Sequence, residues 1–389
     1  MKFDLSDGRL TLFFEGRLDT GNAASVEADI AAISAANPHT ALFIDMQDFE
    51  YISSSGLRVI LRLAKREKNL EIINVSPDVY DVFEMTGFAE MLTIRKAFRR
   101  LSVEGCEVIG RGAKGVVYRY DPETIVKVYK NPDSLDDIMN ERQLAKRAFV
   151  LGVPTAISYD VVKVGDSYGS VFELLNAKSF SKCIANEPEK LDFFCKESAD
   201  LLRQIHETPV KPGDMPDIKL RILGWVKDMQ GQLADDEVEK LRNMVNAVED
   251  THTMIHGDYH TNNIMWQNNE TLLIDMDTLS HGHPVFELAN VYITYVGFGE
   301  VDPSFVADFM GLPYSTCVEF MDRFWRYYFQ TEDSAFIEKA LKPVKLLSYV
   351  RYLRFTRKHY KGTDTDNKII ALCKQKISEL LKETDSLVW

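Results

Sequence analysis

Apolar and polar residues alternate with two different periods along the first hundred residues. Short apolar runs predict strands at 10–14, 41–44 and 70–75. Helix-type patterns lie between and after these runs, over 23–35, 54–68 and 78–86. Leu57, Ile60 and Leu61 recur at helical spacing in the second of these, and Gly87 is a natural stop after the third. Strands that alternate with helices predict a small α/β sheet domain.

The pattern changes after residue 104. Two β-prone segments, 116–120 and 125–129, are separated by the turn residues of an Asp-Pro-Glu sequence, and a helix is predicted over 133–149. The C-terminal part is dominated by helical patterns, which are clearest over 318–329, 334–361 and 367–384. We therefore expect three parts, namely an α/β domain over 1–102, a strand-rich lobe over 103–175 and a helical lobe over 176–389.

Length and composition agree with several folded domains. The chain has 389 residues, 45% hydrophobic and 27% charged, which is typical of globular proteins and excludes a disordered chain. Its apolar runs are far shorter than the ~20 residues that a membrane-spanning helix requires. The N-terminus lacks the basic-then-apolar pattern of a signal region. A cytoplasmic protein is the expectation.

Charge and cysteine content exclude further classes. The formal net charge is -13, so the chain is not expected to bind nucleic acid, and a cationic or neutral substrate is easier to accommodate. The five cysteines are widely scattered and form no CxxC pair, a pattern that predicts neither a zinc site nor a disulfide framework. A basic run over 95–100 is expected to be a solvated helix face or a contact to the acidic part of the chain.

A glycine-rich segment provides the first chemical signal. Gly110, Gly112 and Gly115 form a GxGxxG pattern. A dinucleotide-binding turn requires a helix after the glycines, whereas here β-prone residues follow. Two strands flanking such glycines form a hairpin that covers phosphates, because backbone amides approach the phosphate oxygens closely where no Cβ intervenes.

A lysine follows on the next predicted strand. Lys127 lies between Val126 and Val128, so its side chain points to the opposite face from theirs. Kinases use such a lysine on the nucleotide phosphates, held by a glutamate from a helix. Glu141, within the helix predicted over 133–149, is the candidate partner; Asp136 and Asp137 are weaker alternatives. Taken alone, Lys127 is also compatible with an ordinary edge-strand lysine.

The strongest signal is a constellation of oxygen-bearing side chains over 255–277. Asp258 and Asn263 lie five residues apart, and Asp275 follows twelve residues later at the end of an apolar run. Phosphoryl transfer needs a carboxylate for the attacking hydroxyl and oxygen ligands for Mg²⁺. Asp258 suits the first task, and Asn263 with Asp275 suits the second. Gly257 argues against a helical zinc motif that would use His256 and His260.

Together, the GxGxxG, VxK, HGDxxxxN and IDxD motifs resemble the aminoglycoside phosphotransferase and choline kinase branch of the protein-kinase-like fold. The resemblance implies an α+β two-lobed domain that uses ATP and Mg²⁺ and phosphorylates a hydroxyl acceptor, usually a small molecule. It implies that Asp258 is the catalytic base and that Asp277 is a supporting or substrate residue. The implied nucleotide-binding and metal residues are Gly110, Gly112, Gly115, Lys127, Glu141, Glu173, Leu175, Asn263 and Asp275. In this set, Glu173 to Leu175 would be the hinge that meets adenine.

The first hundred residues carry a second resemblance. A run of three serines at 53–55 precedes a predicted helix, whose N-terminus stabilises a phosphate or is simply capped by a serine. With the segments 16–20, 43–45 and 86–88, this loop resembles a STAS domain, the module of anti-sigma-factor antagonists. The resemblance implies phosphorylation at Ser54, although Ser53 stands where that family usually has Asp. It also implies a protein partner for this domain.

Three functional interpretations remain open from the sequence. The kinase-like part phosphorylates a small molecule, or it phosphorylates a protein serine such as Ser54 of its own STAS domain, which fusion would hold at high effective concentration. In the third interpretation, the kinase-like part is a non-catalytic nucleotide sensor, and the STAS domain binds a partner in a signalling assembly.

Overall fold

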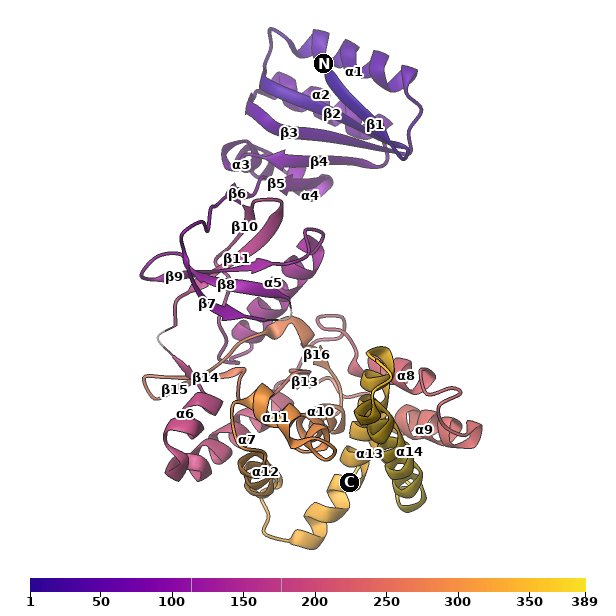
Figure 1. The fold of residues 1–389 in the computed structure, drawn as a ribbon. Helices are drawn as coiled ribbons and strands as arrows, with labels where there is room; N and C mark the ends of the chain where they lie inside the picture. The colour runs from indigo at the N-terminus through magenta and orange to yellow at the C-terminus, as the bar shows by residue number, and fades with distance from the viewer. Residues whose placement is uncertain (113, 176) are drawn as a thin grey trace. The chain divides into compact units, whose positions relative to one another are not determined.

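The computed structural model describes residues 1–112, 114–175 and 177–389 and divides into two compact units (Figure 1). The first unit comprises residues 1–102 together with 161–166. The second comprises residues 103–160 and 167–389. Each unit has its own hydrophobic core.

The first unit is built on a five-stranded sheet in the order β1-β2-β3-β4-β5. β1 runs antiparallel to β2, and the other neighbours are parallel. The strands are β1 (Lys2–Ser6), β2 (Arg9–Leu18), β3 (Ala41–Ile52), β4 (Leu70–Val75) and β5 (Thr93–Lys96). The helices are α1 (Ala23–Ala36), α2 (Ser54–Arg66), α3 (Pro77–Met85) and α4 (Phe88–Met91). The predicted α/β domain is confirmed, since all three expected strands and all three expected helices are present.

The strands that the sequence did not indicate are the edge strands of this sheet. All five residues of β1 are exposed, and β5 contains no buried residue. Such strands lack the apolar run that marks a core strand. The expectation of a helix face at 95–100 is wrong, because β5 covers its first two residues and β6 (Arg99–Arg100) its last two. β6 pairs in parallel with β10 (Asp160–Val164), and this pairing brings residues 161–166 into the first unit.

The second unit starts with an antiparallel sheet in the order β11-β9-β8-β7. Its strands are β7 (Glu107–Arg111), β8 (Gly115–Arg119), β9 (Thr124–Tyr129) and β11 (Ser167–Glu173), and α5 (Leu135–Val150) lies between β9 and β10 in sequence. β9 therefore has a neighbour on each side, and Lys127 lies on an inner strand rather than an edge strand.

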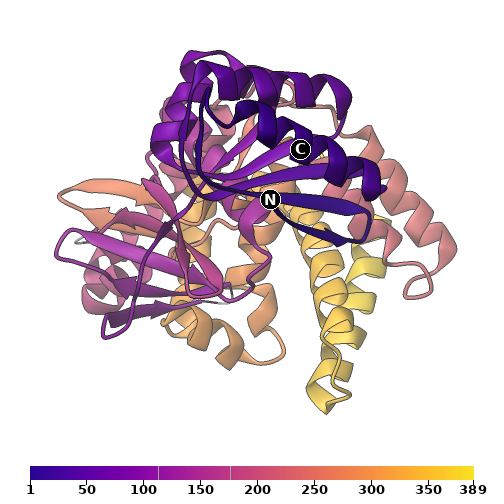
Figure 2. The same ribbon diagram turned by 90° about the horizontal axis from the view of Figure 1, so that it is seen from above.

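The rest of the second unit is mainly helical. Its helices are α6 (Phe180–Asn186), η1 (Pro188–Lys190), α7 (Leu191–Glu207), α8 (Ile218–Lys227), α9 (Asp235–Ala247), η2 (Met276–Thr278), α10 (Val285–Tyr295), η3 (Gly297–Gly299), α11 (Pro303–Met310), α12 (Tyr314–Phe329), α13 (Ser334–Lys358) and α14 (Asp364–Glu383). Short strands complete it, namely β12 (Lys178–Ser179), β13 (Met254–Ile255), β14 (Ile264–Gln267), β15 (Glu270–Leu273) and β16 (Ser280–His281). The long helices α13 and α14 run side by side (Figure 1 and Figure 2).

One helix forms the centre of this helical part. Every residue of α10 is buried, and α10 packs against α8, α12 and α13. A helix that is buried on all sides requires its polar side chains to find partners. Glu287 and Asn290 of α10 do so at the loop that follows β13. None of the described helices is long and apolar enough to span a membrane.

Candidate active site

The glycine-rich segment forms the turn between β7 and β8, as the hairpin interpretation predicts. Gly110 lies in β7, Gly112 lies in the turn, and Gly115 opens β8. A Cβ on Gly115 would lie 2.5 Å from the carbonyl oxygen of Val128, so the close approach of β8 and β9 requires a glycine here. The Gly112 N–H donates to the Gly115 carbonyl at 2.9 Å, and Lys130 Nζ donates to the Gly112 carbonyl at 2.8 Å. The turn is therefore held over β9.

Lys127 lies between two carboxylates of the predicted phosphate site. Its Nζ lies 3.2 Å from Glu141 Oε1 and 3.4 Å from Asp275 Oδ1. The Tyr129 hydroxyl donates to the second oxygen of Glu141 at 3.1 Å. Burial by itself would lower the pKa of Lys127, but the charges of Glu141 and Asp275 raise it above its usual value. Lys127 therefore remains a cation between two carboxylates, and Glu141 is the partner that the structure brings to it.

The loop after β13 places Asp258 and Asn263 close to Asp275. Asn263 Nδ2 donates to the Asp258 carbonyl at 3.0 Å, which leaves its Oδ1 available as an acceptor. The Ile274 N–H donates to the Asn263 carbonyl at 3.0 Å, so the loop is held against the residue that precedes Asp275. Gly257 has φ +86°, and a Cβ there would lie 2.6 Å from the Thr278 carbonyl oxygen. The turn before Asp258 therefore requires glycine.

The electrostatics of Asp258 favour a carboxylate. Burial by itself would raise its pKa, but His260 and Arg351 together hold that pKa below its usual value. His260 Nε2 lies 3.6 Å from Asp258 Oδ2. The pKa of His256 is lowered by burial, so its ring is a neutral neighbour at physiological pH. Asp258 is thus ionised and able to accept a proton.

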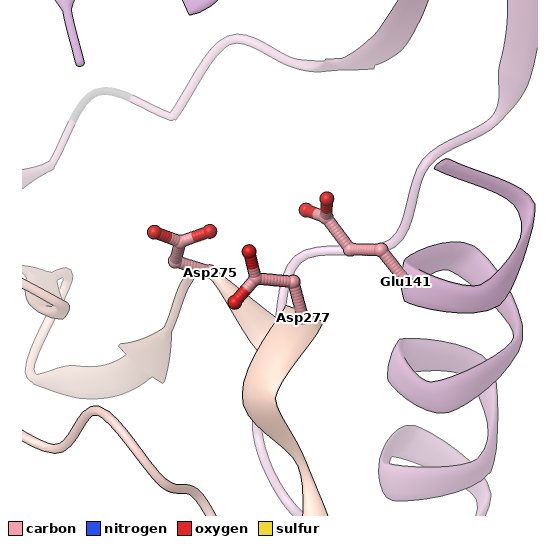
Figure 3. Close-up of side chains that lie close together, drawn as sticks. All are labelled: Glu141, Asp275 and Asp277. Atoms are coloured by element: carbon pink, nitrogen blue, oxygen red, sulfur yellow. The ribbon is translucent and has the colours of Figure 1, made fainter. Parts of the chain in front are cut away.

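Three carboxylates converge beside Lys127. Glu141 projects from α5, Asp275 directly precedes η2 and Asp277 lies within it, and the three carboxylates are turned toward one another (Figure 3). One oxygen from each lies within 4.8 Å of the other two. Lys114 of the glycine-rich turn forms an ion pair with Asp277. Hard oxygen ligands from several carboxylates fit a divalent cation such as Mg²⁺. This cluster differs from the predicted ligand pair, because it contains Glu141 and Asp277 beside Asp275.

The carboxylate cluster opens into a cavity of about 380 Å³. Lys114, Lys130, Asn131, Glu141 and Asp277 are among its lining residues. Two lysines and an amide group beside the carboxylates would suit a phosphate that shares a cation with them. The cavity therefore adjoins the predicted phosphate site.

The predicted hinge, residues 173–175, begins at the last residue of β11. The Leu174 N–H donates to the Glu123 carbonyl at 2.7 Å, which makes 174 and 123 a hydrogen-bonded antiparallel pair. Successive residues of a strand present their backbone groups to alternate sides, so those of Glu173, the last residue of β11, point away from β9. The Tyr159 hydroxyl donates to the Glu173 side chain at 3.2 Å.

Two residues to which the motifs assign no role support the loop that carries Asp258. Glu287 of α10 accepts from the backbone N–H groups of His256 and Gly257 at 2.8 and 2.6 Å. His206 of α7 lies 3.0 Å from the same carboxylate and 2.8 Å from the Tyr328 hydroxyl. The contact of His206 to Glu287 spans 81 positions and left no signal in the sequence.

The serine loop lies in the first unit. Ser53 Oγ accepts from the N–H groups of Ser55 and Gly56 and caps α2, as the capping alternative predicts. The Ser55 hydroxyl lies 3.1 Å from that of Thr20. Ser54 is exposed at the first position of α2, and its hydroxyl has no hydrogen bond within the described parts of the chain. Of the three serines, Ser54 is therefore the one whose hydroxyl is free.

Comparison with known proteins identifies both units. A family model described as "Phosphotransferase enzyme family" matches residues 105–312, and a STAS domain model matches residues 2–101. The protein BtrV of Bordetella bronchiseptica, which carries the provisional name of an anti-sigma factor antagonist, is 31% identical over 98 residues. That match covers 24% of this chain and 84% of BtrV.

The chain also shares similarity with solved structures. The chain is similar to the GDP and kanamycin complex of APH(2")-IIia, with 14% identity and a TM-score of 0.50 over 77% of this chain and 98% of that one. A choline/ethanolamine kinase family protein from Mesorhizobium loti matches 72% of this chain and 92% of its own, with 14% identity and a TM-score of 0.48.

These findings confirm the fold class and the resemblances drawn from the motifs. The predicted kinase-like domain and STAS domain are both present. The chain belongs to the phosphotransferase enzyme family and carries a STAS domain ahead of its phosphotransferase domain.

Proposed function

We propose that this phosphotransferase uses ATP and Mg²⁺ to phosphorylate a hydroxyl group of a small molecule. The observation that carries the proposal is the position of Lys127, 3.2 Å from Glu141 and 3.4 Å from Asp275. A kinase needs a lysine held by a helix glutamate beside the metal-binding aspartate. Asp258 completes the set as an ionised carboxylate on the neighbouring loop.

The chain's residues divide the work of the transfer. Lys127 and the amides around Gly110, Gly112 and Gly115 would hold the nucleotide phosphates. Asp258 would orient the acceptor hydroxyl and accept its proton as the new O–P bond forms and the bond from the γ-phosphorus to the bridging oxygen breaks, releasing ADP.

A divalent cation would be held by oxygens of Asp275 and Asn263, with Asp277 and Glu141 close by. When bound, it supplies charge neutralisation between the β- and γ-phosphates. The carboxylate cluster fits this role, because Mg²⁺ prefers oxygen ligands.

The adenine would lie against the strand end beyond β11. Backbone groups of Glu173 are turned away from β9, and Leu175 follows two residues later, so these two residues would offer their backbone groups to a base. This hinge offers backbone groups rather than side chains. ATP and GTP should therefore be compared directly in the assay.

The proposal is tested by Asp258-dependent ADP formation. Wild-type protein and Asp258→Asn are incubated with ATP, Mg²⁺ and a panel of hydroxylated small molecules. The expected result is ADP formation by the wild type that falls about 10²-fold or more in the variant, with unchanged nucleotide affinity. ATP binding with no turnover of any acceptor, including the chain's own serines, would instead support the nucleotide sensor.

A second candidate acceptor is Ser54 of the STAS domain. Its hydroxyl is exposed and lies at the N-terminus of a 13-residue helix, where backbone N–H groups favour an added phosphate. Fusion of the two domains would supply a high effective concentration. Incubation with γ-labelled ATP, followed by phosphopeptide mapping, tests it. Label at Ser54 in the wild type but not in Asp258→Asn supports it, and absence of label over 53–55 contradicts it.

A further inference from the structure

Two arginines, Arg351 of α13 and Arg221 of α8, have no carboxylate partner in the part of the chain that the structure describes. Arg351 of α13 has a buried Nη1 with no hydrogen-bond partner. Neither Arg351 nor Arg221 of α8 forms an ion pair within residues 1–112, 114–175 and 177–389. Arg354 of α13, by contrast, is paired with Asp228 at 2.6 Å. A buried guanidinium without a partner is costly, so this pair needs an explanation.

Helix packing brings both arginines toward the catalytic loop. The Ser348 hydroxyl of α13 donates to the Ala289 carbonyl of α10 at 2.7 Å, and Arg351 follows one turn later on the same face of α13. The Arg351 guanidinium lies 5.7 Å from the centre of the Trp225 ring. Arg221 precedes Trp225 by four residues and so shares its face of α8. α8 and α13 pack against each other and against α10.

The charge of Arg351 also acts on Asp258. Arg351 is among the groups that lower the pKa of Asp258, and burial lowers the pKa of both arginines from their usual value. The nearby carboxylates are already engaged. Glu287 is used by His206 and two backbone N–H groups, and Asp258 interacts with His260. The buried Nη1 of Arg351 is therefore left without an acceptor, which an anionic group of a ligand beside Asp258 would supply.

We propose that Arg351 and Arg221 select an anionic acceptor, a small hydroxylated molecule that carries a carboxylate or a phosphate. This rests on the proposed function, since it names the class of molecule that Asp258 would deprotonate. A guanidinium presents a planar set of donors that matches both anions. The acceptor's anionic group would bind the arginines, and its hydroxyl would lie at Asp258.

The anionic acceptor proposed here has the opposite charge to the one that the net charge of the whole chain favours. The net charge of -13 favours a cationic acceptor, whereas the group of α13 that acts on Asp258, Arg351, is a cation. Local charges within a few ångströms decide recognition, because charges beyond about 10 Å are screened by salt. A cationic amino sugar would be repelled by two unpaired guanidinium groups.

The test is a binding titration of the full-length protein with Mg²⁺ and a non-hydrolysable ATP analogue. The anionic probes are glycerate, shikimate, glycerol 3-phosphate and glucose 6-phosphate. The counterparts are glycerol, glucose, glucosamine and kanamycin. At least one anion is expected to bind about tenfold or more tightly than its uncharged counterpart, as charge-assisted hydrogen bonds provide. Arg351→Met is expected to remove that advantage. The control variant Arg354→Met, which changes an ion-paired arginine of the same helix, is expected to retain it.

Three further measurements keep the outcomes distinct. Arg221→Met provides a second variant in case Arg351→Met unfolds, and nucleotide affinity reports on folding of the rest of the site. Asp258→Asn should still bind the anion while losing turnover. If the wild type binds an anion but shows no turnover, that result contradicts the proposed function and leaves the inference about the arginines in place. Binding restricted to neutral or cationic probes, binding of none of the four anions, or an anion advantage that survives in both Arg351→Met and Arg221→Met would overturn the inference.

Discussion

Glu287 accepts a hydrogen bond from the backbone N–H of Gly257 at 2.6 Å, one residue before Asp258. The same carboxylate accepts from the His256 N–H at 2.8 Å and is fully buried. Gly257 could not carry a side chain, because a Cβ would meet the Thr278 carbonyl. The position of Asp258 is therefore set from a helix thirty residues away in sequence.

Glu287→Gln should misplace the catalytic loop. A glutamine offers one acceptor oxygen to two backbone donors and no charge to His206, so one buried N–H loses its partner. We expect kcat to fall about 10-fold to 100-fold, the size of effect seen for supporting residues. Nucleotide affinity should change little. Glu300→Gln, whose carboxylate binds the Tyr349 hydroxyl instead, is the matched control for kcat. Equal losses of kcat in both variants would contradict the assigned role.

Glu287 should also make the unfolding free energy depend on pH in the acidic range. Burial by itself would raise the pKa of Glu287, but His206 holds it below its usual value. A carboxyl whose folded pKa is depressed stabilises the fold above its unfolded pKa of about 4.5, and that contribution is lost as pH falls through the folded pKa. The unfolding free energy of wild type should therefore fall more steeply below about pH 4.5 than that of Glu287→Gln. Parallel pH curves for the two proteins would contradict this.

Lys127→Met should remove phosphate positioning and leave two carboxylates without their cation. Loss of one preorganised electrostatic contact costs about 10²- to 10³-fold in kcat. Lys146→Met, an exposed lysine on the outer side of α5, should leave kcat unchanged. Steady-state ADP formation measures both variants. Retained activity in Lys127→Met would show that another residue holds the phosphates.

The pH profile should report the depressed pKa of Asp258. Because His260 and Arg351 hold that pKa below its usual value despite burial, the carboxylate persists well below neutral pH. The acid limb of kcat/KM should therefore lie below about pH 4, the usual range of an aspartate, unless the fold is lost first. Circular dichroism over the same range separates the two causes. An acid limb between pH 6 and 7 in folded protein would point to another base.

Metal dependence should separate the aspartates of the cluster. Asp275→Asn removes the carboxylate that also contacts Lys127, so we expect a large loss of activity that added Mg²⁺ does not restore. Asp277→Asn should raise the Mg²⁺ concentration needed for half-maximal activity about 10-fold, with kcat recovered at saturation. A chelator should abolish activity reversibly. Identical Mg²⁺ titrations for wild type and Asp277→Asn would remove Asp277 from the site.

The serine loop offers a test in the first unit. Ser53→Ala removes the cap of α2 and should lower the unfolding free energy by about 1 kcal/mol. Gly56→Ala places a Cβ 2.7 Å from the Leu18 carbonyl oxygen and should cost about 1–3 kcal/mol. The exposed neighbour Ser54→Ala is the control and should change stability little. Thermal unfolding of the three variants decides the ranking.

Local signals determined much of the fold. Core strands such as β4 and amphipathic helices such as α2 are visible because burial imposes a period of two or 3.6 on the sequence. The exposed strand β1 lacks that pattern and was not predicted. The short strands β13 and β16 depend on pairing with each other across 25 residues, which no local pattern records.

The sequence by itself determined which residue types the site contains, because the spacing of Gly110, Gly112 and Gly115 and of Asp258, Asn263 and Asp275 reflects backbone geometry along short loops. Only the tertiary structure decided which of these side chains meet. It brings Lys127 to Asp275 across 148 positions and Glu287 beneath Gly257. It also leaves Arg351 and Arg221 without ion-pair partners within the part of the chain that the structure describes. Such contacts arise from packing between distant elements, and a single sequence carries no periodicity that records them.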